Sequence, residues 1–272
     1  MAARIRACEQ SDSDNGRSSG ARGEEVVFCP DDRAVTHSQL SAFRQRCEPW
    51  TEQLSSFLDK TVELRPGIIM PVFENDGLEV LAFMLDAEQD VIREIGVCLN
   101  EEERRRAEGL RLERDRRRFV ATRGQLRRVL ASKLGISPSD VELEYGRLGK
   151  PHLSHRMPGR DLRFSVSRSG DVAVVAHSTR QEVGVDIEAV LPVPEADEIA
   201  ALCFSASDYG SYTALGPEDR LEGFLGRWTR LEAISKALGC GLGQPLSWDE
   251  RDWTVRRFVP KSGYIGTVVV RK

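Results

Sequence analysis

The 272-residue sequence lacks an apolar run long enough to cross a membrane, and its first residues lack the apolar core of a secretory signal peptide. Its six cysteines are scattered without a Cys-x-x-Cys pair, so neither a zinc site nor a disulfide framework is predicted. It also lacks a strong excess of one charge: the net charge of −4 gives no global reason to expect nucleic-acid binding. We therefore expect a cytoplasmic monomer that binds neither membranes nor nucleic acids.

The composition is that of an ordinary globular protein, with 40% apolar and 30% charged residues. Residues 1–24 are predicted to form a disordered tail, because they contain almost no large apolar side chains to bury. Residues 25–76 form an N-terminal extension to which the sequence assigns no role. From residue 77 onward, strand-like and helical patterns alternate, and the chain is long enough for a sizeable core.

A charged helix is predicted to begin after Asn100, because this residue and Glu103 have the spacing of a capping box. Its helical pattern continues through Leu134 and ends at Gly135, where glycine favours a helix C-terminus. A second long helix is predicted over residues 221–239, and it also ends in a serine-lysine pair followed by leucine and glycine.

This internal similarity indicates two related parts of the chain, since each helix lies among predicted strands. We therefore predict an α+β fold of two similar halves, residues 77–180 and 181–272. We expect the halves to be related by a pseudo-two-fold axis, with the active site between them.

The stretch Gly184-Val185-Asp186-Ile187-Glu188 has the alternation of a strand. Asp186 and Glu188 are predicted to lie on one face, and Val185 and Ile187 on the other, toward a core. Paired carboxylates on a rigid element suit a hard cation such as Mg²⁺, which prefers oxygen ligands. A strand with two solvated acids is the simpler alternative, and the Asp-x-Glu pattern alone does not decide between them.

Two turns and one helix carry groups that suit phosphate. Gly146-x-x-Gly149-Lys150 allows a tight turn that brings Lys150 close to a ligand, although it also fits a plain hairpin. The turn Ser167-Arg168-Ser169-Gly170 could cradle phosphate, but such turns also form for local reasons. Glu232 and Lys236 lie on one side of the later helix, where the alternative is an ordinary surface pair worth about 0.2–0.5 kcal/mol.

In this order, the motifs of residues 77–272 resemble those of the Sfp-type 4′-phosphopantetheinyl transferases. The matching motifs are Gly146-x-x-Gly149-Lys150-Pro151, Phe164-x-x-Ser167-x-Ser169, Gly184-x-Asp186-x-Glu188 and Trp228-x-x-x-Glu232-Ala233-x-x-Lys236-x-x-Gly239. The resemblance implies an Mg²⁺-dependent enzyme that transfers phosphopantetheine from coenzyme A to a serine of an acyl or peptidyl carrier protein. The other product would be adenosine 3′,5′-bisphosphate.

The resemblance also implies roles for the acidic residues. Asp186, Glu188 and Glu232 would hold Mg²⁺ on the pyrophosphate of coenzyme A. Glu232, or a metal-bound water, would accept the proton of the attacking serine. Lys236 would neutralise phosphate charge as this develops, in a reaction that depends mostly on positioning and charge neutralisation.

Five further residues would contact coenzyme A if the resemblance holds. Lys150 would neutralise a phosphate, and Ser167 and Arg168 would bind phosphate oxygens. Arg118 and Arg123, on the first long helix, would bind the nucleotide phosphates; the alternative is that both are solvated arginines in a charged helix.

Three residues depart from the family pattern. Arg168 stands where histidine is frequent, but arginine also binds phosphate. Asp208 replaces a frequent glutamate, and Leu231 replaces a lysine that often precedes the helical glutamate. Arg230 is adjacent but points about 100° away on a helix. The alternatives are a catalytically weakened module that binds coenzyme A or a carrier protein, and an Mg²⁺-dependent phosphoesterase.

Overall fold

The computed structural model describes residues 63–272, apart from residues 76, 180, 241 and 243–247. The tail predicted at residues 1–24 and most of the extension at residues 25–76 lie outside this part of the chain. Among the helices described, none is both long and apolar enough to cross a bilayer.

The described residues form helices and antiparallel strands, as an α+β fold requires. The strands are β1 (Met70–Asn75), β2 (Leu78–Met84), β3 (Leu143–Tyr145), β4 (Pro151–Leu153), β5 (Arg163–Ser169), β6 (Val172–Ser178), β7 (Val183–Ala189), β8 (Trp253–Phe258) and β9 (Tyr264–Arg271). The helices are α3 (Gln89–Gly96), α4 (Glu101–Glu108), α5 (Glu113–Leu134), α6 (Ala196–Cys203), α7 (Ala206–Thr213) and α8 (Pro217–Leu238), with 3₁₀ turns η2 (Pro138–Asp140) and η3 (Glu250–Asp252).

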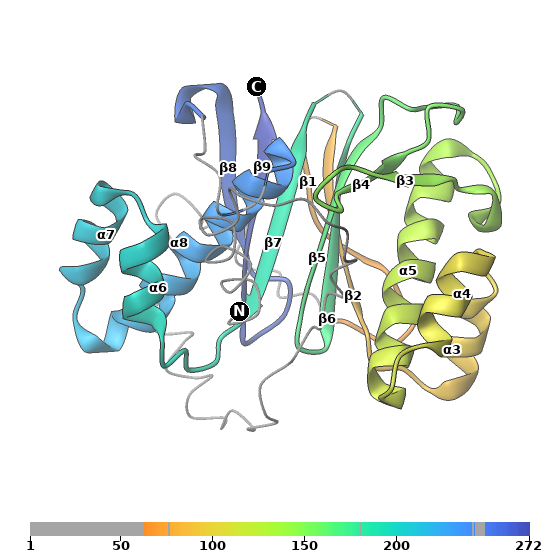
Figure 1. The fold of residues 1–272 in the computed structure, drawn as a ribbon, viewed down its shortest axis with the longest axis horizontal. Helices are drawn as coiled ribbons and strands as arrows, with labels where there is room; N and C mark the ends of the chain where they lie inside the picture. The colour runs from red at the N-terminus through yellow and green to blue at the C-terminus, as the bar shows by residue number, and fades with distance from the viewer. Residues whose placement is uncertain (1–62, 76, 180, 241, 243–247) are drawn as a thin grey trace, which may run out of the picture.

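The elements are arranged in layers, with sheets in the middle and helices on both outer sides (Figure 1). One sheet has the strand order β1-β2-β6-β5 and is covered by α3, α4 and α5. The other has the order β7-β9-β8 and is covered by α6, α7 and α8. The predicted α+β class is therefore confirmed, while the pseudo-two-fold relation of the halves stays a prediction.

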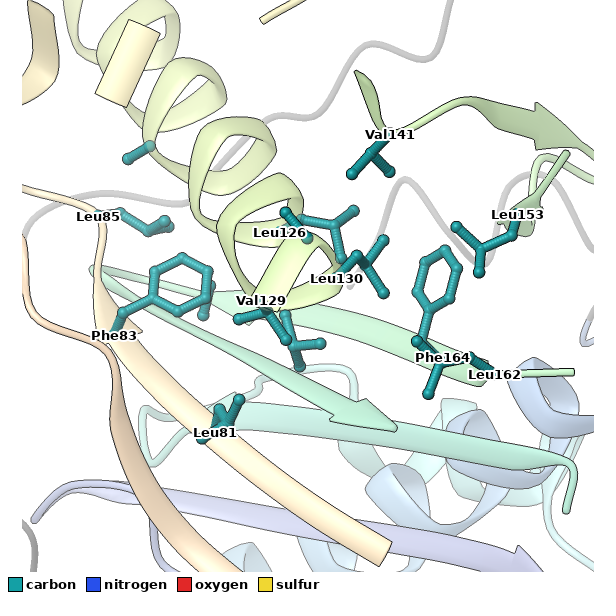
Figure 2. Packing of buried hydrophobic residues seen from close by; sticks show 14 of the residues in the cluster. Leu81, Phe83, Leu85, Leu126, Val129, Leu130, Val141, Leu153, Leu162 and Phe164 are labelled. Atoms are coloured by element: carbon teal, nitrogen blue, oxygen red, sulfur yellow. The ribbon is translucent and has the colours of Figure 1, made fainter. Parts of the chain in front are cut away.

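Strand alternation divides the apolar residues between two cores. Leu81 and Phe83 of β2 face α5, where they pack with Leu126 and Leu130 (Figure 2). The alternate residues of β2 and β6 point to the opposite face of this sheet. There they pack against the other sheet, which includes Val185, and form a second core. Since β6 is buried on both faces, it needs a continuous apolar run rather than an alternating pattern.

The long helix expected from residue 101 to Leu134 is interrupted, so this prediction is wrong in its continuity. The capping box is confirmed, because Asn100 Oδ1 accepts from Glu103 N and Glu103 Oε2 accepts from Asn100 N. However, α4 ends before Gly109, and α5 begins after a short connection. Leu110, within this connection, packs against a small apolar cluster between α4 and α5, and glycine at the preceding position disfavours helix.

The two long helices, α5 and α8, have the same length of 22 residues. Gly135 and Gly239 end them in the left-handed conformation, each with φ of 67°. The predicted helix end at Gly135 is thus confirmed. The first sheet also includes β1, which lies before residue 77 and pairs with β2.

Candidate active site

Three serines join the two sheets at their edges. β5 is the last strand of the first sheet, and β7 is the first strand of the second. Unpaired backbone N–H groups at a strand edge need acceptors when they are buried. Here the acceptors are the hydroxyls of three serines of β5, which we call the serine ladder (Ser165, Ser167 and Ser169). Val185 N donates to Ser165 Oγ at 3.1 Å, Ile187 N to Ser167 Oγ at 3.3 Å, and Ala189 N to Ser169 Oγ at 3.0 Å.

The two carboxylates of the Asp-x-Glu motif lie beside this ladder. Asp186 is fully buried, and its Oδ1 accepts a hydrogen bond from Ser167 Oγ at 2.7 Å. Glu188 is half-buried, and its Oε2 accepts from Ser169 Oγ at 2.7 Å. Val185 belongs to the core between the sheets, so the predicted alternation is confirmed. The alternative of two solvated acids is wrong for Asp186.

Helix α8 adds an ammonium group and a third carboxylate to the same place. Lys236 Nζ lies 2.6 Å from Asp186 Oδ1 and donates to Ser167 Oγ at 3.0 Å. The same ammonium lies 3.8 Å from Oε2 of Glu232, whose side chain is 4% exposed. The interpretation of Glu232 and Lys236 as an ordinary surface pair is therefore wrong.

Gly184 explains why α8 can lie so close to β7. A Cβ atom at this position would be 1.9 Å from the carbonyl oxygen of Ala233 and 2.6 Å from the nitrogen of Ala237. Only glycine fits such a contact between two backbones. Because α8 crosses β7 here, Glu232 and Lys236 of the same helical stretch come next to Asp186.

The chemistry of this group fits a hard divalent cation. Its possible ligands are the carboxylate oxygens of Asp186, Glu188 and Glu232, and oxygen is the ligand atom that Mg²⁺ prefers. Among the residues described, however, no three acidic, histidine or cysteine side chains are arranged to hold a metal ion. Lys236 instead supplies the positive charge between Asp186 and Glu232. Mg²⁺ binding therefore stays a prediction.

Lys150 connects the glycine-rich turn to the second sheet and its helix. Gly149 has a φ of 81°, and the turn joins β3 to β4 as a hairpin. Lys150 Nζ donates to the carbonyl oxygen of Ala237 at 2.9 Å and lies 3.4 Å from Glu182 Oε2. Burial lowers the pKa of Lys150, and Glu182 partly opposes this shift. The turn is thus a hairpin whose lysine also reaches α8, next to Lys236.

The three predicted arginines lie elsewhere. Arg168 alternates with Ser167 along β5 and so is on the face directed toward α5. Arg118 forms two hydrogen bonds with Asp86, at 2.8 and 2.7 Å, and its side chain is 16% exposed. Arg123 lies over the rings of Phe119 and Tyr145 and lines a cavity of about 120 Å³. The interpretation of Arg118 as a solvated helix residue is wrong, since it is paired.

Comparisons with known proteins identify the family. The chain matches the model of the 4′-phosphopantetheinyl transferase superfamily over residues 182–266, and that of the 4′-phosphopantetheinyl transferase N-terminal domain over residues 86–180. The 4′-phosphopantetheinyl transferase HetI of Nostoc sp. is 30% identical over 62% of this chain and 72% of its own length. The chain belongs to the 4′-phosphopantetheinyl transferases.

Further relatives of this transferase support the assignment. A putative 4′-phosphopantetheinyl transferase of Synechocystis sp. is 33% identical over 61% of the chain and 68% of its own length. The 4′-phosphopantetheinyl transferase AcpT of Salmonella typhimurium is 38% identical over 45% of the chain and 61% of its own length. The predicted enzyme class is therefore confirmed.

The residue beside the helical glutamate of the transferase remains a departure from the family pattern. Leu231 is half-buried and offers no polar group. Arg230 does not take over its place, because it forms an ion pair of 2.6 Å with Asp208. This pair joins α8 to α7.

Sequence reasoning missed two parts of the site. The role of Ser165 and Ser169 in joining the two strands was not predicted, although serine at every second position of a strand is a signal that the sequence contains. Gly184 also received no role, and its close contact with α8 has no local signal beyond the glycine itself.

Proposed function

We propose that this transferase moves the 4′-phosphopantetheine group from coenzyme A to a serine hydroxyl of an acyl or peptidyl carrier protein. Family membership supports phosphopantetheine transfer, and the donor and acceptor are the proposed part. The observation that supports them best is the group formed by Ser167, Asp186, Glu232 and Lys236. It combines buried carboxylates with an ammonium at the joint of the two sheets.

The proposed reaction converts the phosphoanhydride of coenzyme A into a phosphodiester on the carrier serine. The serine oxygen of the carrier protein forms a bond to the phosphorus that bears pantetheine, and the bond from this phosphorus to the bridging oxygen breaks. The leaving group, adenosine 3′,5′-bisphosphate, takes the electron pair. Such reactions depend on positioning and on neutralisation of phosphate charge rather than on covalent intermediates with the enzyme.

All three carboxylates are metal ligands in this proposal, and Glu232 is also the general base. Asp186, Glu188 and Glu232 would hold Mg²⁺, which neutralises pyrophosphate charge when bound. Glu232 accepts the proton of the carrier serine, since it is buried at the same place and a carboxylate can act as general base. In the structure described, Lys236 forms an ion pair with Asp186. When coenzyme A binds, the ammonium of Lys236 leaves Asp186 and contacts the phosphate oxygens instead.

The position of β5 fits a substrate that carries phosphates at both ends of a nucleotide. Ser167 lies on the side of the carboxylates, and Arg168 lies on the side of α5. We infer that coenzyme A passes over this edge strand, with its pyrophosphate near Ser167 and Lys150. Its nucleotide phosphates would then meet Arg168, together with Arg118 and Arg123 of α5, after Arg118 exchanges Asp86 for phosphate.

An intact-mass experiment tests the proposal. The protein is incubated with coenzyme A, Mg²⁺ and several apo carrier proteins, while a known transferase modifies the same carriers in parallel. We expect the carrier mass to increase by one phosphopantetheine group, and the increase to disappear with EDTA. If only the known enzyme modifies the carriers, the proposed substrate pair is wrong.

The ion pair between Arg230 and Asp208, next to Leu231, favours one alternative, a weakened module that binds coenzyme A or the carrier without transfer. Calorimetry with coenzyme A and the mass experiment together distinguish the two. Binding without transfer supports the module, and transfer at the rate of the parallel enzyme excludes it. A phosphoesterase would release the bisphosphate in the absence of any carrier.

A further inference from the structure

Two of the ladder serines make a second contact besides the backbone contact that joins the sheets. Ser167 and Ser169 accept from the backbone of β7 and also donate to a carboxylate of the same strand. We propose that Ser169 is a positioning residue that orients Glu188 as a metal ligand, as Ser167 orients Asp186. This inference rests on the proposed function, because it assumes that Glu188 binds Mg²⁺.

The hydrogen-bond geometry fixes the direction of the Ser169 proton. A serine hydroxyl has one proton and accepts through its lone pairs. Ala189 N of β7 donates to Ser169 Oγ at 3.0 Å, so one lone pair of this oxygen is directed at the backbone of β7. Its proton is directed to Glu188 Oε2, at 2.7 Å, which is a normal length for a hydroxyl bound to a charged carboxylate.

The repeat of this contact shows that it is a property of the two strands and not an accident of one side chain. Each ladder serine binds the backbone nitrogen 20 residues later. Since side chains alternate along a strand, a slip of β5 by one residue would turn all three serines away from β7. The ladder thus keeps the carboxylates of β7 in register with the hydroxyls of β5.

Ser169 orients a longer and more exposed side chain than Ser167 does. Asp186 is fully buried and also held by Lys236. Glu188 lies at the half-buried end of the ladder and has one more rotatable bond. Loss of a partner that orients a metal ligand typically costs about 10–100-fold in metal affinity.

Ser165 provides a matched control within the same ladder. Its hydroxyl accepts from Val185 N like the other two, but the residue before Val185 is Gly184, which has no carboxylate. Ser165→Ala therefore removes a contact between the sheets without removing a contact to a proposed ligand. Ser169→Ala removes both.

The test measures binding of Mn²⁺ alone, a probe that takes the same oxygen ligands as Mg²⁺. Free Mn²⁺ is counted by electron paramagnetic resonance during titration of the metal-free protein. We expect Ser169→Ala to weaken Mn²⁺ binding by about tenfold. Ser165→Ala should bind Mn²⁺ as the wild type does, although both variants lower the melting temperature.

A second pair of variants separates the hydroxyl from packing. Ser169→Thr keeps the hydroxyl, and Ser169→Val has nearly the same shape without it. We expect the threonine variant to bind Mn²⁺ within about twofold of the wild type, and the valine variant to behave like Ser169→Ala, as the loss of one orienting hydroxyl predicts. This pair carries the test if the alanine variant does not fold.

The outcomes distinguish the inference from the function on which it rests. If wild-type protein and Ser169→Val bind Mn²⁺ equally well, the positioning role is wrong and the proposed function is unaffected. If the wild type transfers phosphopantetheine but binds no Mn²⁺, either alone or with coenzyme A, both the metal ligands and the role of Ser169 are wrong. Equal weakening by Ser165→Ala and Ser169→Ala would also overturn the inference.

Discussion

Helices α5 and α8 have the same length and the same glycine ending, yet they use buried charge in different ways. In α5, Arg127 is 1% exposed and binds Glu103 at 2.7 Å, and it also donates to carbonyl oxygens that follow the helix. In α8, Lys236 is the only ammonium that the described contacts place between Asp186 and Glu232.

This comparison separates structural charge from functional charge. The buried Arg127 binds one carboxylate, on α4, and carbonyl oxygens that follow α5, so its charge holds α4 against α5. In α8, Lys236 lies near two carboxylates, Asp186 and Glu232, and carboxylate oxygens that gather in one place are the ligands that a hard cation takes. Both helices carry a buried charged side chain, Arg127 in α5 and Glu232 in α8, and the two differ in the kind of groups that surround them.

The largest effect is expected at Asp186, on the functional side of the comparison. Asp186→Ala should reduce transfer by at least about 100-fold, because outer partners of a metal ligand alone account for up to that factor. Initial rates of carrier modification at saturating Mg²⁺ measure this. Circular dichroism shows whether the variant is folded, and Asp186→Asn replaces it if it is not. Wild-type rates in a folded variant would exclude Asp186 from the site.

The next effect is expected at Arg127, on the structural side. Arg127→Met leaves Glu103 buried without its partner, which should lower the free energy of unfolding by about 3–5 kcal/mol. Urea titration measures this loss. Adding Glu103→Gln removes the buried charge and should restore part of it. Transfer per folded molecule should stay at the wild-type value; a loss comparable to that of Asp186→Ala would contradict the distinction between the two helices.

A smaller effect on stability is expected at Lys236. Lys236→Met removes a charged hydrogen bond from Asp186 and should lower the free energy of unfolding by about 2 kcal/mol in EDTA. Mg²⁺ should stabilise this variant more than it stabilises the wild type, because the cation no longer competes with the ammonium. Thermal unfolding with EDTA and with Mg²⁺ compares the two proteins. Equal stabilisation by Mg²⁺ would show that Lys236 does not occupy the place of a cation.

These predictions use contacts that the sequence could indicate only in part. Alternation placed Asp186 and Glu188 on one face, and glycine marked the end of α5 at Gly135, because both are local properties of the chain. The pairing of Ser167 with Asp186, or of Arg118 with Asp86, joins residues 19 and 32 positions apart. Such contacts depend on which sheet edges meet, and no local period of the sequence contains this information.

The separation of one helix into α4 and α5 was missed for a similar reason. Charged residues on both sides of Gly109 fit a single helix, whereas the connection forms because Leu110 finds an apolar cluster between the two helices. The burial of Lys150 and Glu232 was likewise unpredictable from their own segments, since each is covered by a different part of the chain.

The smallest effect is expected at a second aspartate, Asp171, which connects the turn between β5 and β6 to the start of β9. Burial raises the pKa of Asp171, but hydrogen bonds from Lys261 and Tyr264 outweigh this and lower it overall. Its contribution to stability is therefore present above the pKa of the unfolded chain, and it is lost as the pH falls through the lower pKa of the folded protein.

Asp171→Asn should accordingly cost about 1 kcal/mol near neutral pH and less in acid. Urea unfolding of both proteins across the acid range measures this, and transfer near neutral pH should be retained. A difference in stability that is constant from neutral to acid pH would contradict the low pKa of Asp171. Loss of transfer would place this aspartate with Asp186 rather than outside the site.

Gly184 controls the site although it has no side chain to react or bind. The space at this position is too small for a Cβ atom, and this close approach of the two backbones sets the separation of strand and helix. Any larger residue would push the helix outward and carry Glu232 and Lys236 away from Asp186 together. The distances between the reactive groups of the site therefore depend on a residue that has no reactive group of its own.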